Sequence, residues 1–407
     1  MKIVQINTFP YKATGSIMMS IHNKLQEMGH ESYVAWGRGR DAQSKHEIVI
    51  KDDLGMKLHG VYTRLTDKTG FASSKSTWKL LEELEKIKPD IIHLHNIHGY
   101  YLNIELLFEY IKSHNIKVIW TLHDCWSFTG HCAYFDQVRC ERWKTGCYKC
   151  PQKHTYPESK CLDNSRWNWE RKKELFTGAE ITLVTPCEWL KEIVRLSFLK
   201  EYPVEVIYNG IDCDTYHPKE TDFEEKYNLA EKYVILGVAS EWTERKGLKD
   251  FIELSRMLDD KYKIVLVGLK KEQIKKLPNR IIGIERTSSV KELVGIYSRA
   301  NVFFNPTYED NFPTTNIEAI ACQTPVITYN TGGSPEAIDS NTGYVVEKGN
   351  IREVFKIITS GKQLEIGNIK ESFTKQTMIS RYLELYERKQ KTERRKCSEN
   401  SGKSIVY

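Results

Sequence analysis

The chain has 407 residues, more than one hydrophobic core usually supports, so we expect two domains. It is 40% hydrophobic and 28% charged with a formal net charge of +6, which is typical of a globular protein and does not indicate a nucleic-acid partner. No apolar run approaches the roughly 20 residues that span a bilayer, and the first residues read as a strand rather than a signal peptide. We therefore expect a cytoplasmic protein.

Short apolar runs alternate with helical segments along the first half of the chain. Strands are predicted at 2–7, 31–36, 90–95, 117–123 and 181–186. After a loop over 8–14, a helix is expected from about Gly15, and Gly29 ends it. Continuous apolar strands separated by helices predict a parallel sheet that is covered on both faces.

The same pattern restarts after Asn209. Strands are predicted at 233–240, 262–268, 280–284, 301–305 and 325–329, and a last helix at about 377–389. The α/β pattern thus predicts two Rossmann-like domains, 1–205 and 206–375, with 376–407 forming a helix that packs back on the first domain and a basic tail. Ligands of open parallel sheets bind beyond the carboxyl ends of the strands, so we expect a cleft between the domains.

The segment after Asn305, NPTYEDNFPTTNIEAIACQTPVITYNTGGSPE, carries the strongest signal. A strand ends, acids follow at Glu309 and Asp310, and Pro313 opens a helix that contains Glu318. A helix N-terminus is a natural seat for a diphosphate. A carboxylate in the helix can accept hydrogen bonds from ribose hydroxyls, and an acid before it can reach the sugar beyond the phosphates. This order fits a nucleotide-sugar.

The spacing of these acids resembles the motif of glycosyltransferase family 4, within the GT-B fold. Asp310 and Glu318 match its two acids, followed by AIACQTPVI and a Gly-Gly pair. Asp310 stands where the family has Glu, and Glu309 is the alternative first acid. The segment VASEWTERKGLKDF resembles a second motif: Lys246 matches its lysine, Glu241 replaces its arginine, and Arg245 is the candidate second cation.

Residues of the first half extend the resemblance over nearly the whole chain. His123 resembles the family histidine at the donor sugar, and Gly15 the glycine of its phosphate-side loop. His95, Asn96 and Asp124 are assigned to the acceptor side. VTPCEWL and VIYNGID resemble further family signposts, and TGHCAYF and ERKG are shared with transferases of bacterial exopolysaccharide, capsule and O-antigen, including the colanic-acid branch.

The resemblance implies retaining transfer of a hexose-type sugar from a UDP- rather than GDP-sugar to a glycan or an undecaprenyl-diphosphate-linked acceptor, with no metal needed for catalysis. It places His123, Asp310 and Glu318 at the reacting sugar and donor. Arg245, Lys246 and Ile284 complete the donor site, with the cations on the diphosphate, where fixed positive charge stabilises the leaving group. The alternatives are a nucleotide-sugar epimerase of the same fold and a non-catalytic sugar-nucleotide-binding scaffold.

Six of the ten cysteines fall within a long insertion, 125–161. Cys132, Cys140, Cys147 and Cys150 have a spacing that can close a tetrahedral structural zinc site, and the alternative is free thiols. A loop of this length between a strand and a helix needs additional contacts or a bound metal ion to hold its conformation.

Two basic stretches predict peripheral contact with an anionic inner membrane. The segment 56–79 mixes large apolar side chains, such as Leu58 and Trp78, with lysines and an arginine. The tail from Arg388 carries six cations within nine positions. Cations near an anionic surface add reversible, salt-sensitive affinity. A solvated loop and a solvated tail are the alternative.

Overall fold

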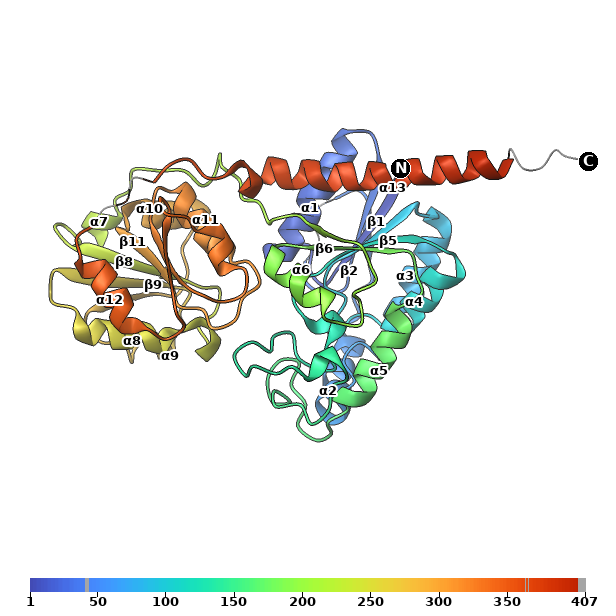
Figure 1. Ribbon diagram of the computed structural model, residues 1–407, viewed down its shortest axis with the longest axis horizontal. Helices are drawn as coiled ribbons and strands as arrows, with labels where there is room; N and C mark the ends of the chain where they lie inside the picture. Colours follow the sequence, from blue (N-terminus) through green and yellow to red (C-terminus); the bar gives the residue numbers. More distant parts are fainter. Residues whose placement is uncertain (41–43, 363, 365, 402–407) are drawn as a thin grey trace, which may run out of the picture. The chain divides into compact units, whose positions relative to one another are not determined.

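The computed structural model describes residues 1–40, 44–362, 364 and 366–401, and side chains up to residue 390. The chain divides into two compact units (Figure 1). Unit 1 comprises Met1–Pro186, Leu190–Ile207 and the chain from Ile379, and unit 2 comprises Cys187–Trp189 and Tyr208–Met378.

Unit 1 is a seven-stranded parallel sheet in the order β3-β2-β1-β4-β5-β6-β7. Its strands are β1 (Lys2–Asn7), β2 (Glu31–Trp36), β3 (Glu47–Val49), β4 (Ile91–Leu94), β5 (Lys117–Thr121), β6 (Ile181–Thr185) and β7 (Val204–Val206). Its helices are α1 (Lys12–Glu27), α2 (Asp53–Thr66), α3 (Ser74–Ile87), α4 (Ile104–Ser113), α5 (Ser165–Phe176) and most of α6 (Glu188–Arg195) and α13 (Lys375–Ser401). The strand order reverses between β1 and β4, which is where ligands of such sheets bind.

Helix α13 is fixed to the sheet of unit 1 by buried polar contacts. The hydroxyl of Tyr386 lies 2.6 Å from His93 Nδ1 on β4, and that of Tyr382 lies 3.0 Å from Thr121 Oγ1 on β5. Lys117 Nζ donates to the carbonyl of Lys389 at 3.0 Å. The end of the chain therefore belongs to the unit in which the chain begins.

Unit 2 is a six-stranded parallel sheet in the order β10-β9-β8-β11-β12-β13. Its strands are β8 (Tyr233–Val238), β9 (Tyr262–Val267), β10 (Ile281–Ile284), β11 (Val302–Asn305), β12 (Val326–Tyr329) and β13 (Gly343–Val346). Its helices are α7 (Phe223–Lys226), α8 (Leu248–Met257), α9 (Lys271–Ile274), α10 (Val290–Arg299), α11 (Thr314–Ala321) and α12 (Ile351–Thr359). Here the order reverses between β8 and β11.

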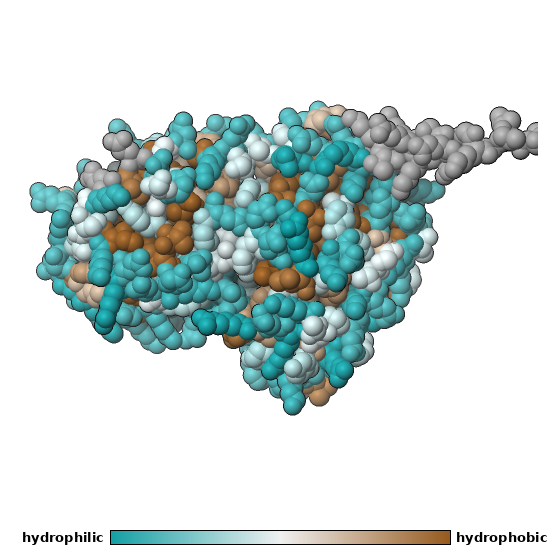
Figure 2. Space-filling model, viewed as in Figure 1, coloured by the Kyte–Doolittle hydropathy of each residue, from teal (hydrophilic) through white to brown (hydrophobic). Residues whose placement is uncertain are grey.

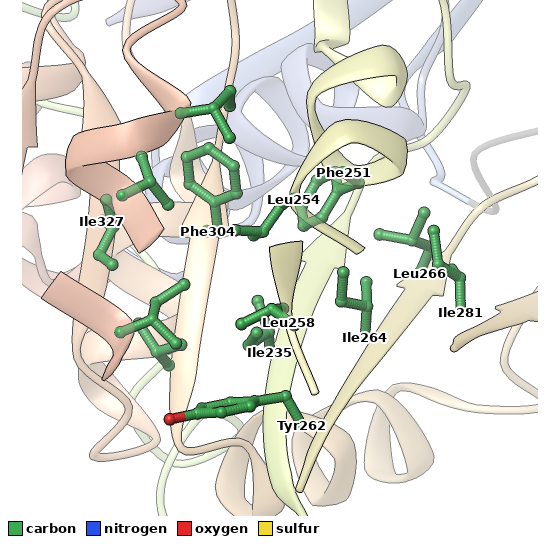
Figure 3. Close-up of a cluster of buried hydrophobic side chains, with 14 of the residues drawn as sticks. Ile235, Phe251, Leu254, Leu258, Tyr262, Ile264, Leu266, Ile281, Phe304 and Ile327 are labelled. Atoms are coloured by element: carbon green, nitrogen blue, oxygen red, sulfur yellow. The ribbon is translucent and has the colours of Figure 1, made fainter. Parts of the chain in front are cut away.

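Each face of this second sheet has its own core. Side chains of α8 and α12 pack on one face around Phe251, Phe304 and Ile264 (Figure 3), and those of α7, α10 and α11 pack on the other around Phe303 and Tyr297. Because both faces are covered, the strands are apolar throughout, which is the feature that predicts them from sequence.

Most strand ends differ from the sequence prediction by one or two residues, and two helix starts differ as well. Helix α1 begins at Lys12 rather than near Gly15, and α13 begins at Lys375. Lys12 has a left-handed φ of 66°, a conformation that a lysine does not predict. Three edge strands, β3, β7 and β13, were not predicted; β3 and β7 each contain a glutamate, so neither is a continuous apolar run.

The surface seen in Figure 2 is mainly hydrophilic, with smaller brown apolar areas between the teal hydrophilic residues. None of the helices in the described part of the chain is both long and apolar enough to cross a membrane.

Candidate active site

The two motifs of the second half of the chain fold into neighbouring loops at the β8–β11 reversal of unit 2. The loop after β8 ends in a 3-10 turn, Glu244–Lys246, and the loop after β11 carries Asp310. Lys246 Nζ and Asp310 Oδ2 form an ion pair of 2.5 Å, and their side chains are 21% and 16% exposed. The structure thus brings together two residues that are 64 positions apart at the place where a parallel sheet binds its ligand.

Arg245 joins the same two loops by hydrogen bonds that involve backbone carbonyl groups. Its guanidinium donates to the carbonyl of Glu309 at 2.6 Å, and its own carbonyl accepts from the amide of Tyr308 at 2.8 Å. Gly247 follows with a φ of +73°, and a Cβ there would lie 2.3 Å from the carbonyl oxygen of Pro306. The Lys-Gly pair is therefore required for the close approach of the loops as well as for charge.

The two neighbouring acids lie in different surroundings. The side chain of Glu309 is buried, at 5% exposure, whereas Asp310 pairs with Lys246. Glu241, which replaces the family arginine, forms an exposed ion pair with Lys270 at 2.5 Å. Because Glu241 is an acid, it cannot supply the positive charge that the family arginine brings to these loops.

Glu318 lies on α11 and receives a hydrogen bond from the hydroxyl of Tyr297 at 3.1 Å. Burial raises the pKa of Glu318, and hydrogen bonds from Thr314 and Tyr297 oppose that rise. Tyr297, on α10, was not predicted as a site residue, because its apolar neighbours mark it as core. Its contact with Glu318 depends on how α10 packs against α11, and this packing could not be predicted from the sequence.

The Gly-Gly pair closes the donor-side loops. The amide of Gly333 donates to the carbonyl of Asn311 at 2.8 Å, and a Cβ on Gly333 would lie 2.2 Å from that oxygen. Cys187 Sγ lies 3.1 Å from the same carbonyl. Ile284, assigned to the donor, is 7% exposed and packs in the core of unit 2, while its carbonyl accepts from the amides of Gly268 and Leu269.

In unit 1, the histidines predicted for the site lie where β4 and β5 end. His95 Nδ1 and His123 Nε2 share a hydrogen bond of 3.1 Å. Burial lowers the pKa of His123 to about 4, so this ring is neutral at physiological pH. Asp124 pairs with His98 at 2.8 Å; burial alone would raise the pKa of Asp124, but the charge and hydrogen bond of His98 outweigh it and lower that pKa.

His95, Asn96, His98, His123 and Asp124 line one small pocket. The sequence prediction missed His98, although it lies only two residues beyond Asn96, because a loop histidine has no periodic signal. Gly15 lies on α1, where a Cβ would come within 2.6 Å of the carbonyl oxygen of Phe9. This glycine is required for the tight turn from β1 into α1.

The structural zinc prediction is not supported. Within the described residues, no group of three or more His, Cys, Asp or Glu side chains is arranged to hold a metal ion. Of Cys132, Cys140, Cys147 and Cys150, the first and last share a thiol hydrogen bond that lowers the pKa of Cys150 to about 7. Cys147 Sγ instead accepts a hydrogen bond from the amide of Gly130 at 3.1 Å.

Other contacts stabilise the cysteine-rich insertion. The ring of Trp143 stacks on Phe135 at 4.8 Å and is 2% exposed. His131 forms a fully buried ion pair with Asp67. Lys172 Nζ donates to the carbonyls of Trp126 and Thr129, at 2.8 and 3.1 Å. An aromatic core and buried polar contacts therefore hold this loop.

Two parallel α/β sheets with polar loops at both strand-order reversals are the architecture of the GT-B fold. Residues 15–215 match the model described as Glycosyltransferase Family 4, and residues 219–377 the model described as Glycosyl transferases group 1. The chain belongs to this family of glycosyltransferases.

Curated relatives and solved structures agree with this assignment. The chain is 24% identical to the Escherichia coli protein named as the colanic acid biosynthesis glycosyl transferase WcaC, over 88% of this chain and 90% of that protein. It is 27% identical to the capsular polysaccharide biosynthesis glycosyltransferase CapM of Staphylococcus aureus, over 45% of this chain and 52% of CapM. HepE of Anabaena in complex with UDP shares the fold, with a TM-score of 0.66 and 14% identity over 95% of this chain and all of HepE.

Proposed function

We propose that this protein transfers a hexose-type sugar, with retention of anomeric configuration, from a UDP-sugar to a glycan or lipid-linked acceptor in bacterial surface polysaccharide synthesis. The observation that carries the proposal is the Lys246–Asp310 pair, which holds a cation and an acid together at the strand-order reversal of unit 2. The names of WcaC and CapM support polysaccharide synthesis, and the HepE complexes with UDP and UDP-glucose support a UDP donor. A Campylobacter relative, 25% identical, is named for transfer to an undecaprenol-linked diphosphate.

The donor is held by charge on one side and by hydroxyl recognition on the other. Lys246 and Arg245 neutralise the diphosphate, and fixed cations there favour the transition state in which it departs. Glu318 accepts hydrogen bonds from the ribose hydroxyls. Asp310, freed when Lys246 turns to phosphate, accepts from the donor sugar.

Transfer proceeds by attack on the face from which the leaving group departs. The bond between the acceptor oxygen and the anomeric carbon forms as the bond from that carbon to the phosphate oxygen breaks. The acceptor's proton passes to the leaving phosphate. His123 contributes as a neutral hydrogen-bonding group at the donor sugar, because burial keeps its pKa at about 4.

A panel of UDP-, GDP- and dTDP-sugars tests this proposal, since a ligand that binds only the native state raises the melting temperature. Product analysis follows with lipid-linked and soluble glycan acceptors. A new glycosidic bond with retained configuration and free UDP is expected. An isomerised sugar would identify an epimerase, binding without any product a scaffold, and inverted configuration would contradict the mechanism.

We also propose that unit 1 meets an anionic membrane through α2. Four large aliphatic side chains of this helix, each at least half exposed, fall within an arc of about 60° at 100° per residue: Leu54, Leu58, Val61 and Leu65. Buried His59 and Thr63 mark the opposite face. Lys57 and Arg64 both lie along one side of the stripe, and Arg64 is only loosely paired with Glu158, at 3.8 Å.

The size of this stripe favours a bilayer over a second copy of the chain. Covering the remaining exposed half of four such side chains contributes roughly 3–6 kcal/mol, enough for reversible docking. A stable protein interface needs about 20–30 residues a side, far more than one stripe offers. In the basic tail, Arg388 pairs with Glu205 at 2.9 Å, and the side chains from 391 onward lie outside the described residues.

Co-sedimentation with phosphatidylglycerol vesicles tests this surface. Replacing Leu58 and Val61 together by Asp should abolish binding, whereas Leu196→Asp, at an equally exposed leucine of unit 1, should not. Added salt should weaken binding through the flanking cations. Unchanged binding of the double variant, or equal binding to neutral vesicles, would contradict the proposal.

A further inference from the structure

Asp250 is a buried carboxyl group of unit 2 that the proposed mechanism does not use. It lies in the first turn of α8 and is 7% exposed. Among the described residues, no lysine, arginine or histidine forms an ion pair with it. Its two oxygens instead accept hydrogen bonds from two phenols. Tyr308 donates to Oδ1 at 3.2 Å, and Tyr329 donates to Oδ2 at 2.9 Å.

Stability alone does not explain a carboxyl group at this position. A buried carboxylate without a cation loses its hydration, and two neutral donors restore only part of that loss. Burial accordingly raises the pKa of Asp250, and the hydrogen bonds from Tyr329 and Tyr308 oppose that rise. Replacing a buried ionic group by an apolar one of similar volume is often neutral or stabilising. What Asp250 contributes is therefore the direction of its two hydrogen bonds.

Asp250 joins the two loops of the candidate active site. Its amide donates to the carbonyl of Gly247 at 3.0 Å, so it belongs to the turn that directly follows the Lys-Gly pair. Tyr308 lies two residues before Asp310, in the loop after β11. The hydroxyl of Tyr308 reaches Asp250, and its amide donates to the carbonyl of Arg245 at 2.8 Å. Tyr308 is thus tied to the first loop through both its side chain and its backbone.

Tyr329 fixes the orientation of the Asp250 carboxyl group from the sheet. It is the last residue of β12 and is fully buried. Its hydroxyl donates to Asp250 and accepts a hydrogen bond from the amide of Gly349. The rings of Tyr308 and Tyr329 meet edge-on, with their centroids 5.6 Å apart. One oxygen of Asp250 is therefore held by the rigid sheet, and the other is directed at the loop after β11.

We propose that Asp250 is a positioning residue of the donor site. Held by Tyr329, it sets, through Tyr308, the position of the loop that presents Asp310 to the donor sugar. The inference rests on the proposed function for the assignment of Asp310 to that sugar. It predicts that loss of the Tyr308 hydroxyl loosens this loop and weakens contact with the sugar rather than with UDP.

Amide hydrogen exchange of the full chain without ligand tests the positioning itself. Tyr308→Phe and Asp250→Ala should each speed exchange over residues 307–312 about threefold to tenfold, the effect of one hydrogen bond on local opening. The matched variant Tyr344→Phe, at a half-buried tyrosine of the same core, should leave exchange in this loop unchanged. Adding Tyr308→Phe to Asp250→Ala should change nothing further, because the partner of the hydroxyl is already absent. Unchanged exchange in Tyr308→Phe, or additive effects in the double variant, would overturn the positioning role.

Calorimetric titration separates a role at the donor sugar from a general loss of structure. The probes are UDP and UDP-glucose, or the UDP-sugar of the panel that binds the unmodified protein more tightly. Tyr308→Phe should weaken binding of the UDP-sugar about threefold to tenfold and leave that of UDP unchanged, because Lys246 and Glu318 lie on other segments. Equal loss for both ligands, or no loss for either, would overturn the link to the sugar. If no UDP-sugar binds the unmodified protein, the proposed function fails, whereas faster exchange in Tyr308→Phe would still establish that Asp250 positions the loop.

Discussion

Replacing Glu318 by Gln tests the donor site with little change in shape. The carboxylate can accept from two neighbouring ribose hydroxyls, whereas the amide keeps one acceptor oxygen and places a donor where the second stood. One hydrogen bond to a charged group, worth about 1.5–3 kcal/mol, is lost. At 1.4 kcal/mol per tenfold, kcat/KM for the donor should fall by about 10-fold to 150-fold.

Tyr297 supplies the matched control, because it touches Glu318 without belonging to the predicted donor contacts. Its hydroxyl, 3.1 Å from Glu318 Oε2, lowers a pKa that burial raises. Removing that hydroxyl in Tyr297→Phe should therefore raise the pKa of Glu318 further. Since the ionised form binds ribose, activity is present above this pKa and lost as pH falls through it.

Initial rates with varied UDP-sugar, measured from pH 4 to 8, separate the two effects. Glu318→Gln should lower kcat/KM at every pH, whereas Tyr297→Phe should move the acidic limb of the profile to higher pH. An unchanged donor kcat/KM in Glu318→Gln, or an acidic limb that moves to lower pH in Tyr297→Phe, would refute the assignment of Glu318 to the donor.

Three further predictions follow from the contacts. Lys246→Ala should cut turnover at saturating donor by roughly two orders of magnitude, because stabilisation of the leaving group is lost. The control Lys249→Ala should retain near-normal rates, because the side chain of Lys249 is 78% exposed and pairs with Glu244 at the surface. Replacing Cys147 and Cys150 by Ser should lower the melting temperature and leave UDP affinity unchanged by calorimetry; a loss of UDP affinity would contradict a purely structural role. Gly333→Ala should lower the free energy of unfolding by about 1–3 kcal/mol in urea denaturation, because a Cβ would lie 2.2 Å from a carbonyl oxygen, and an unchanged midpoint would contradict that steric argument.

The two sheets could be predicted from the sequence because their strands are buried on both faces and therefore apolar throughout. The loops that follow those strands could be predicted too, and His123 and Asp310 lie in them. The contacts between loops that follow different strands could not be predicted in the same way. The pair of Lys246 with Asp310 depends on β8 lying beside β11, and the sequence gives no direct sign of that neighbour relation.

The zinc prediction is not supported, although the structure brings Cys132, Cys140, Cys147 and Cys150 to one pocket with His131. Cysteine spacing indicates which thiols can come together, but not whether three or more ligands are arranged to hold a metal ion, and within the described residues none are. Here the ring of Trp143 and the buried pair of His131 with Asp67 hold the loop, and Asp67 comes from a helix end far away in the sequence. The contact of Tyr297 with Glu318 was missed because it, too, depends on packing between residues that are distant in the sequence.

The two strand-order reversals differ in charge. The loops of unit 2 hold Arg245 and Lys246 close to Glu309 and Asp310. The described lining of the unit 1 pocket holds Asp124, paired with His98 at 2.8 Å, and no lysine or arginine. Because fixed cations stabilise a departing diphosphate, this difference favours the loops of unit 2 over the unit 1 pocket as the proposed site of the donor's diphosphate.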